Sequence, residues 1–207
     1  MEQPYYWLNE IKKILAIAQT GLAYGNNPYD QDRYNHLVEI SQNLLKYYTD
    51  NDFEKIKLFF SNEKGYITPK VDIRAVIFDN RKILMVKERI DGLWSIPGGW
   101  ADVGLTPFGI AIKETNEESG LNIISERVLA IMDNKCHQHP PSLYYTYKIF
   151  IQCKVIGGQL KPGMETRDVK YFDIDDLPPL SVNRITANQI NILWNQYQNS
   201  TLPIYCD

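Results

Sequence analysis

The spacing of the apolar residues changes near residue 65, and this change limits the possible folds more than any other feature. Before it, apolar residues recur at steps of three and four from Trp7 to Leu22, which is the period of a helix with one buried face. Gly25-Asn26-Asn27-Pro28 then interrupts the pattern. A second helix is expected to bury Tyr34, Leu37, Ile40, Leu44 and Tyr48. With a third, short helix over about 52–60, residues 1–65 are predicted to form a small all-α domain.

After residue 65 the pattern becomes that of strands alternating with helices. Residues 71–78 and 83–87 are predicted to pair as a hairpin around Asp79-Asn80-Arg81. Further strands are expected at 94–96, 127–132, 144–155 and 169–172, and helices at 107–119 and 185–197. Such an order predicts an α/β sandwich, a mixed sheet with helices packed on it, over residues 66–207.

Composition and charge exclude several classes of function. The formal net charge is -3, so the chain lacks the basic surplus expected of a protein that reads nucleic-acid sequence. The longest apolar run near the N-terminus, residues 14–18, is too short to cross a membrane. Three cysteines without a framework spacing fit a reducing compartment, so we expect a cytoplasmic protein.

The segment Gly98–Leu121, "GGWADVGLTPFGIAIKETNEESGL", carries the clearest local signals in the chain. Thr106 is a good N-cap, Pro107 suits the first helical position and Gly120 suits the left-handed residue after a helix. A helix is therefore expected over 107–119. Its inward stripe is predicted to be Phe108, Ala111, Ile112 and Thr115.

Glu114, Glu117 and Glu118 share one side of that helix, because they stand at i, i+3 and i+4. Carboxylates are disfavoured near the negative end of a helix, and a divalent cation would neutralise them. Clustered hard oxygen ligands suit Mg²⁺ or Mn²⁺. The alternative is a solvated acidic face, which is common on protein surfaces. The metal site is favoured here because Pro97-Gly98-Gly99 and a loop with Asp102 precede the helix.

This segment resembles the Nudix box, whose pattern is GX5EX7REUXEEXGU, where U is an aliphatic residue. The residues that match it are Gly99, Glu114, Glu117, Glu118, Gly120 and Leu121. The resemblance implies a Nudix-type α/β/α sandwich with a mixed sheet. It also implies hydrolysis of a nucleoside diphosphate linked to another moiety. Metal ions would be held by the three glutamates and by Gly99, whose backbone is free to aim a carbonyl at a metal.

Three positions depart from the box. Leu105 stands where the family has its first glutamate, Lys113 replaces the arginine, and Thr115 replaces an aliphatic residue. Asp102 either supplies some of the acid lost at Leu105 or simply caps the loop. Because the metal-binding carboxylates are intact, we expect an active enzyme. The alternative is a catalytically weak Nudix-fold nucleotide sensor or regulator.

Other candidate site residues lie outside the box. Glu165, in "GMETRDVKYF", is at a spacing where many family members carry a further catalytic glutamate, although a surface loop acid is an equal alternative. Arg74, Arg89 and Trp100 are at positions from which they would meet a phosphate or a base, or they are structural. His139 belongs to a loop that either flanks the substrate or is a plain connector. No zinc site is expected, since the loop offers no second pair of ligands.

The helical leader adds a narrower resemblance, to a bacterial Nudix subgroup labelled ADP-ribose or CDP-choline pyrophosphatase. This implies a small-molecule nucleotide substrate. Members similar to this chain are often homodimers. The leader carries more apolar and aromatic side chains than so small a domain can bury alone, so we expect it to help form a homodimer.

Overall fold

A computed structural model of the chain describes residues 6–48 and 66–207. The chain divides into two compact units, Met1–Thr68 and Pro69–Asp207, and each is described by itself. Among the described residues, no helix has the length and apolar character needed to cross a membrane.

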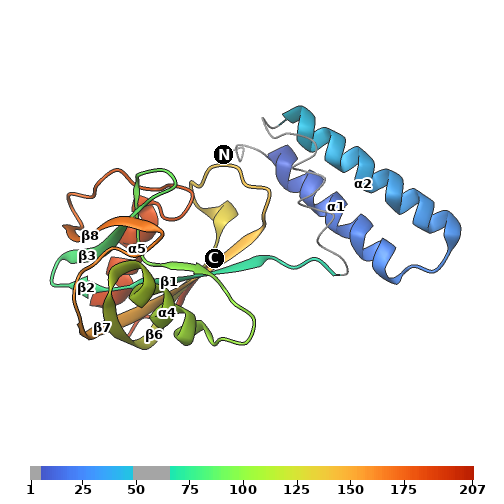
Figure 1. Ribbon diagram of the computed structural model, residues 1–207. Helices are drawn as coiled ribbons and strands as arrows, with labels where there is room; N and C mark the ends of the chain where they lie inside the picture. The colour runs from blue at the N-terminus through green and yellow to red at the C-terminus, as the bar shows by residue number, and fades with distance from the viewer. Residues whose placement is uncertain (1–5, 49–65) are drawn as a thin grey trace. The chain divides into compact units, whose positions relative to one another are not determined.

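The first unit contains two helices that run side by side in opposite directions, α1 (Tyr6–Tyr24) and α2 (Pro28–Tyr48) (Figure 1). They are separated by the predicted break. A glycine allows their close approach, since a Cβ added at Gly21 would lie 2.4 Å from the ring of Tyr34. The predicted third helix falls on residues outside the described ranges.

The buried face of α1 agrees with the sequence except at Ile14, which is 40% exposed, whereas the buried face of α2 does not agree. On α1, Leu8, Ile11, Leu15 and Ala18 are buried as expected. On α2 the predicted face is wrong, because Leu37, Ile40 and Leu44 are 36%, 53% and 36% exposed. The buried positions are instead Ser41, Gln42 and Leu45. Ser41 can be buried because its hydroxyl donates a 2.7 Å hydrogen bond to the Leu37 carbonyl.

The second unit is built on two sheets. One has the order β5-β1-β7-β6-β9, and in the other β3 pairs with β2, β4 and β8. The strands are β1 (Lys70–Val76), β2 (Phe78–Asp79), β3 (Lys82–Glu88), β4 (Trp94–Ser95), β5 (Gly98–Trp100), β6 (Leu121–Asp133), β7 (Thr146–Gly158), β8 (Thr166–Asp173) and β9 (Tyr205–Cys206). The sheets are mixed, because β1 runs parallel to β7 and antiparallel to β5.

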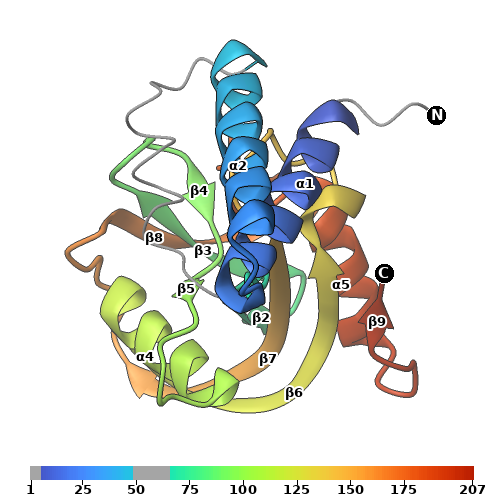
Figure 2. The same cartoon turned by 90° about the vertical axis from the view of Figure 1, so that its right-hand side faces the viewer.

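Two helices cover opposite sides of these sheets, α4 (Pro107–Ser119) and α5 (Ala187–Gln198) (Figure 2). Two apolar cores result. One joins Ile110 and Ala111 of α4 to strand residues such as Ile73. The other joins Ile190 and Leu193 of α5 to residues of the opposite side. The predicted α/β/α sandwich with a mixed sheet is therefore confirmed.

Some predicted strands have different limits. The strand expected over 71–78 is two strands, since β1 and β2 belong to different sheets. Strand β6 begins at Leu121, directly after α4, and is longer than the predicted 127–132. The short strand β9, which pairs with β6, was not predicted. A short 3-10 helix, η1 (Asn134–Cys136), follows β6.

Candidate active site

Helix α4 has the limits and the caps that the sequence predicts. The Thr106 hydroxyl accepts a 3.1 Å hydrogen bond from the Gly109 amide. Gly120 adopts the left-handed conformation, with φ 72°, and its amide donates to the Asn116 carbonyl. The predicted inward stripe is partly wrong, however. Phe108 and Ile112 are exposed, and the buried face is formed by Ile110, Ala111, Thr115, Glu118 and Ser119.

The three glutamates of α4 differ sharply in their surroundings. Glu118 is only 6% exposed, and one of its carboxylate oxygens accepts a 2.9 Å hydrogen bond from the Gly98 amide. The Glu114 side chain is 16% exposed and that of Glu117 is 58% exposed. Two of the three glutamates are therefore drawn into the protein rather than displayed on a solvated face.

Glycines allow β5 to pass close to these carboxylates. Gly98 has φ 143°, and a Cβ there would lie 2.0 Å from the Ile73 carbonyl, so only glycine fits. A Cβ at Gly99 would lie 3.1 Å from a carboxylate oxygen of Glu114. The two glycines thus bring backbone amides and carbonyls up to the acidic groups, as the sequence suggested.

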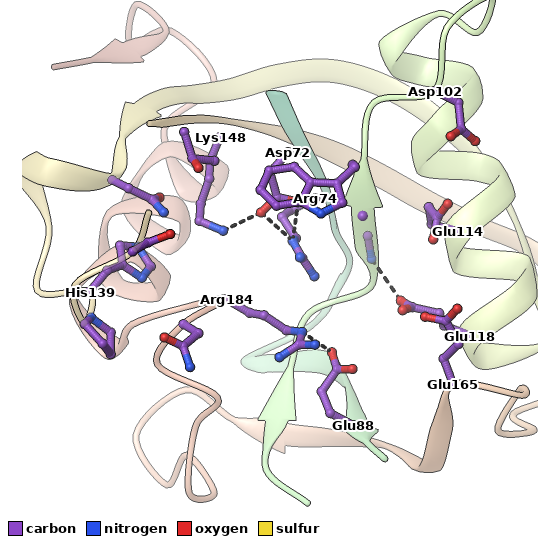
Figure 3. Close-up of a pocket in the computed structure, with 18 of the residues that line it drawn as sticks. Asp72, Arg74, Glu88, Asp102, Glu114, Glu118, His139, Lys148, Glu165 and Arg184 are labelled. Carbon is purple, nitrogen blue, oxygen red and sulfur yellow. Dashed lines mark hydrogen bonds and ion pairs between the residues drawn. The ribbon is translucent and has the colours of Figure 1, made fainter. Parts of the chain in front are cut away.

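A cavity of about 560 Å³ opens beside α4. Figure 3 shows Glu114, Glu118 and Glu165 on one side of it and Lys148 and His139 on the other. Of the site residues predicted from the sequence, the cavity is lined by Arg74, Gly99, Trp100, Glu114, Glu118, His139 and Glu165. Arg89 and Glu117 are not among its lining residues.

A buried cluster of charges forms part of the cavity lining. Asp72 of β1 is paired in register with Lys148 of β7, and the lysine ammonium donates to the Asp72 carboxylate. The Arg74 Nε donates to the same carboxylate at 2.9 Å. All three residues are buried. One carboxylate thus holds two cations, which leaves a net positive charge on this part of the lining.

Burial and charge shift the pKa values of this cluster in opposing ways. Burial alone would raise the pKa of Asp72, but the charges of Arg74 and Lys148 outweigh it and hold that pKa below its ordinary value. Burial lowers the pKa of Lys148 to about 8, although Asp72 opposes the change. The Lys148 ammonium therefore titrates near neutral pH in the absence of a bound anion.

A second ion pair lies at the lower edge of the cavity as drawn in Figure 3. The Arg184 Nε lies 3.0 Å from a carboxylate oxygen of Glu88. Arg184 also approaches Asp91 at 3.6 Å, and Asp91 accepts a 2.6 Å hydrogen bond from the Ser181 hydroxyl. Burial raises the pKa of Glu88, which is only 4% exposed.

The loop that carries Glu165 is fastened to the C-terminal end of α4. The Thr166 hydroxyl donates a 2.8 Å hydrogen bond to the Glu118 carbonyl. A Cβ at Gly163 would lie 1.8 Å from the Glu117 carbonyl, so the loop passes directly against the helix. The Glu165 carbonyl accepts from the Arg89 amide at 2.9 Å. These contacts place Glu165 on the same side of the cavity as Glu114 and Glu118.

The two remaining predicted residues lie at other parts of the cavity. Trp100 is half exposed and makes an edge contact with Tyr144, with 5.6 Å between ring centroids. His139 is neutral, because burial lowers its pKa to about 4. Its Nδ1 lies 2.7 Å from the Val182 carbonyl, so that nitrogen carries the proton.

The donor chemistry of the acidic side fits a hard divalent cation. Carboxylate oxygens are the ligands that Mg²⁺ and Mn²⁺ prefer. Burial raises the pKa of Glu118 to about 8, and the charge of Arg74 only partly offsets the effect. Within residues 6–48 and 66–207, however, no three His, Cys, Asp or Glu residues are already gathered closely enough to hold a metal ion. Side-chain adjustment would therefore accompany metal binding.

Four other residues that line the cavity were not predicted from the sequence: Asp72, Glu88, Lys148 and Arg184. A usable signal existed for two of them. Lys148 lies inside "YTYKIFIQ", and Asp72 lies beside apolar residues of β1, so each is a charged side chain in an otherwise apolar strand. Such residues are rarely buried without a partner.

Comparisons with known proteins agree with the fold and the box. Residues 68–191 match the NUDIX domain family, and residues 5–60 match a family described as a UDP-X-like, N-terminal oligomerisation domain. The chain is 43% identical to the putative ADP-ribose pyrophosphatase YjhB of Bacillus subtilis, over 91% of both chains. The chain therefore belongs to the Nudix family. The expected class of enzyme, a Nudix hydrolase acting on phosphorus anhydrides, is confirmed by these matches.

Two solved structures are also similar. The crystal structure of a UDP-X diphosphatase is 34% identical, with a TM-score of 0.63, and the match covers 97% of each chain. An ADP-ribose pyrophosphatase from Streptococcus suis is 41% identical, with a TM-score of 0.62, and the match covers 68% of this chain and all of the other.

Proposed function

We propose that the protein is a metal-dependent pyrophosphohydrolase that cleaves the diphosphate of a nucleoside diphosphate linked to another moiety. The observation that carries the proposal is the division of the cavity. Three carboxylates, Glu114, Glu118 and Glu165, face a lining that contains Arg74 and Lys148. A diphosphate carries dense negative charge, which the two cationic side chains would bind and which a metal ion held by the carboxylates would offset.

The roles of the side chains follow from their charge and burial. Arg74 and Lys148 bind phosphate oxygens, and Asp72 holds both cations in place. Glu114 and Glu118, with Glu117 and the Gly99 carbonyl, would hold Mg²⁺ or Mn²⁺. Such an ion would stabilise the charge that develops on the leaving oxygens and would lower the pKa of a water. Glu165 accepts a proton from the attacking water.

The groups on either side of the diphosphate would contact other lining residues of the cavity. Trp100, with Tyr144 against its edge, offers an aromatic surface for a base. His139 offers a neutral imidazole beside Lys148, which suits an uncharged polar group better than an anion. Arg89, whose side chain is exposed and outside the cavity lining, would contact only a part of the substrate that projects into solvent.

The substrate class is narrowed by the relatives. Those above are named ADP-ribose pyrophosphatase or UDP-X diphosphatase, and the sequence itself suggested ADP-ribose or CDP-choline. We therefore propose an ADP-ribose or CDP-choline type of substrate, and UDP-linked compounds belong in the same test.

The test is a substrate panel. ADP-ribose, CDP-choline and a UDP-sugar are incubated with the protein and Mg²⁺ or Mn²⁺, and alkaline phosphatase then releases phosphate from the cleaved products only. We expect phosphate release with at least one compound and its loss when EDTA is added. Binding of a nucleotide without cleavage of any compound would favour the sensor alternative instead.

We also propose that the protein is a cytoplasmic homodimer in which residues 1–65 form the oligomerisation domain and residues 66–207 the hydrolase domain. Support comes from the family matched by residues 5–60 and from apolar side chains that the first unit leaves exposed. Those side chains are Ile14, Ile17 and Tyr24 of α1 and Tyr29, Leu37, Ile40 and Leu44 of α2. A second copy of the chain would cover them. The three free cysteines support a reducing compartment.

A further inference from the structure

The side chain of Lys113 lies among three carboxylates. Its ammonium is 3.1 Å from an oxygen of Asp102, 3.1 Å from an oxygen of Glu114 and 3.6 Å from an oxygen of Glu117. Glu114 and Glu117 are proposed metal ligands and belong to α4. Asp102 belongs to the loop before the helix, and its carbonyl accepts from the Leu105 amide at 3.3 Å. One ammonium is thus shared between the proposed metal site and a carboxylate outside it.

This sharing creates a conflict when a divalent cation binds. The cation and the ammonium would compete for the carboxylates of Glu114 and Glu117, and they repel each other. If the cation takes the two oxygens that Lys113 contacts, Asp102 is the remaining partner of the ammonium among the three carboxylates. Without Asp102, the ammonium would stay against Glu114 and Glu117 or would lie unpaired beside a new positive charge.

We propose that Asp102 is a positioning residue that holds the Lys113 ammonium off Glu114 and Glu117, so that these carboxylates are free for the metal ion. It thereby acts as the partner of the basic box residue, at a position three residues before the leucine that replaces the box glutamate. This inference rests on the proposed function, because it assumes a metal site at the carboxylates of α4.

Two features of the structure support this role over a loop cap. The Asp102 side chain accepts from Lys113 at 3.1 Å, across eleven positions of sequence, so its contact is with the helix. The cap of α4 is supplied by Thr106 instead. Both Asp102 and Lys113 are substantially exposed, with side chains 54% and 39% accessible, so either can be replaced without burying an unpaired charge.

The test is a double-mutant cycle with Mn²⁺ affinity as the measured quantity. Titration calorimetry and electron paramagnetic resonance give the Kd of Mn²⁺ for four full-length proteins: wild type, Asp102→Asn, Lys113→Met and the double variant. An exposed ion pair changes an equilibrium constant by up to about fivefold. We therefore expect Asp102→Asn to weaken Mn²⁺ binding about threefold to fivefold in the wild-type background, and to have no effect once Lys113 is methionine.

Two outcomes would overturn the inference. Equal weakening by Asp102→Asn in both backgrounds would show that Asp102 acts on the metal directly, and no weakening in the wild-type background would show that it has no role. If wild type binds no Mn²⁺ at all, the proposed metal site fails as well, so the two failures are distinguishable. Asp176→Asn and Lys154→Met are exposed control changes outside the cavity lining, and thermal unfolding shows whether each variant folds.

Discussion

Replacing Glu118 by glutamine should stabilise the metal-free protein at alkaline pH. The same change should remove most of the activity that the protein has in the presence of metal. The reason for the stabilisation is the burial of this carboxyl group, which is 6% exposed. Its partner, the Gly98 amide, donates a 2.9 Å hydrogen bond that a glutamine oxygen accepts equally well. The substitution therefore removes a charge while it keeps the shape and the hydrogen bond.

The size of the effect follows from the pKa of Glu118, which burial raises from 4.5 to about 8. In the folded protein the group keeps its proton at a pH where the unfolded chain has lost it. Stability of the wild type therefore falls as the pH rises from about 4.5 to about 8, and the full penalty is present above about pH 8. A shift of this size corresponds to at most about 5 kcal/mol. Because water and local relaxation reduce it, we expect Glu118→Gln to gain about 2 kcal/mol at about pH 9.

The assay is urea unfolding in EDTA at about pH 6 and about pH 9, followed by tryptophan fluorescence. Three of the four tryptophans, Trp94, Trp100 and Trp194, belong to the second unit and report on it. Added Mg²⁺ should stabilise the wild type more than the variant, since the metal relieves the penalty. Glu117→Gln is the matched control, because its side chain is 58% exposed and should show little pH-dependent gain. An unchanged or lower stability of Glu118→Gln at about pH 9 would show that burial of the charged Glu118 carboxylate does not destabilise the folded protein.

Three further predictions concern other parts of the chain. Leu105→Glu should leave turnover within about twofold of wild type, since Asp102 already pairs with Lys113, and a severalfold gain would show that the chain has lost a working acid. The value of kcat/KM should fall above about pH 8 as Lys148 loses its proton. Lys148→Arg should remove this fall, because arginine stays charged. The same pH profile in both proteins would contradict the proposed role of Lys148 in phosphate binding. Ile40→Lys should shift the mass measured by light scattering from dimer toward monomer, whereas Asn35→Lys, an exposed control on another face of α2, should not. An unshifted Ile40→Lys would count against this face as the interface.

The local parts of the fold could be predicted from the sequence because their signals are local. Thr106, Pro107 and Gly120 specify the limits of α4 by their own backbone preferences, and the structure has those limits. The buried faces were harder to predict. Leu37 and Ile40 have the right helical spacing, yet they are exposed, because the period of a helix does not say whether a partner lies within the same unit.

The residues of the cavity also differ in how far the sequence predicts them. The carboxylates of α4 follow from a short stretch of sequence, whereas the cationic lining depends on strand pairing. Asp72 and Lys148 are 76 positions apart, and they meet because β1 and β7 pair in parallel with these two residues in register. The burial of Glu118 depends on Gly98 reaching it from β5. Contacts of this kind come from topology, which residue spacing alone does not specify.

Product analysis with the wild type and Glu118→Gln tests most sharply whether the cavity cleaves a diphosphate between the carboxylates of Glu114, Glu118 and Glu165 and the cations of Arg74 and Lys148. Each is incubated with ADP-ribose, CDP-choline or a UDP-sugar at saturating Mg²⁺, and the products are identified by mass spectrometry. We expect a nucleoside monophosphate and a phosphorylated second moiety from the wild type, and turnover lower by at least about 100-fold in the variant. Wild-type turnover in Glu118→Gln, or products cleaved outside the diphosphate, would contradict this expectation.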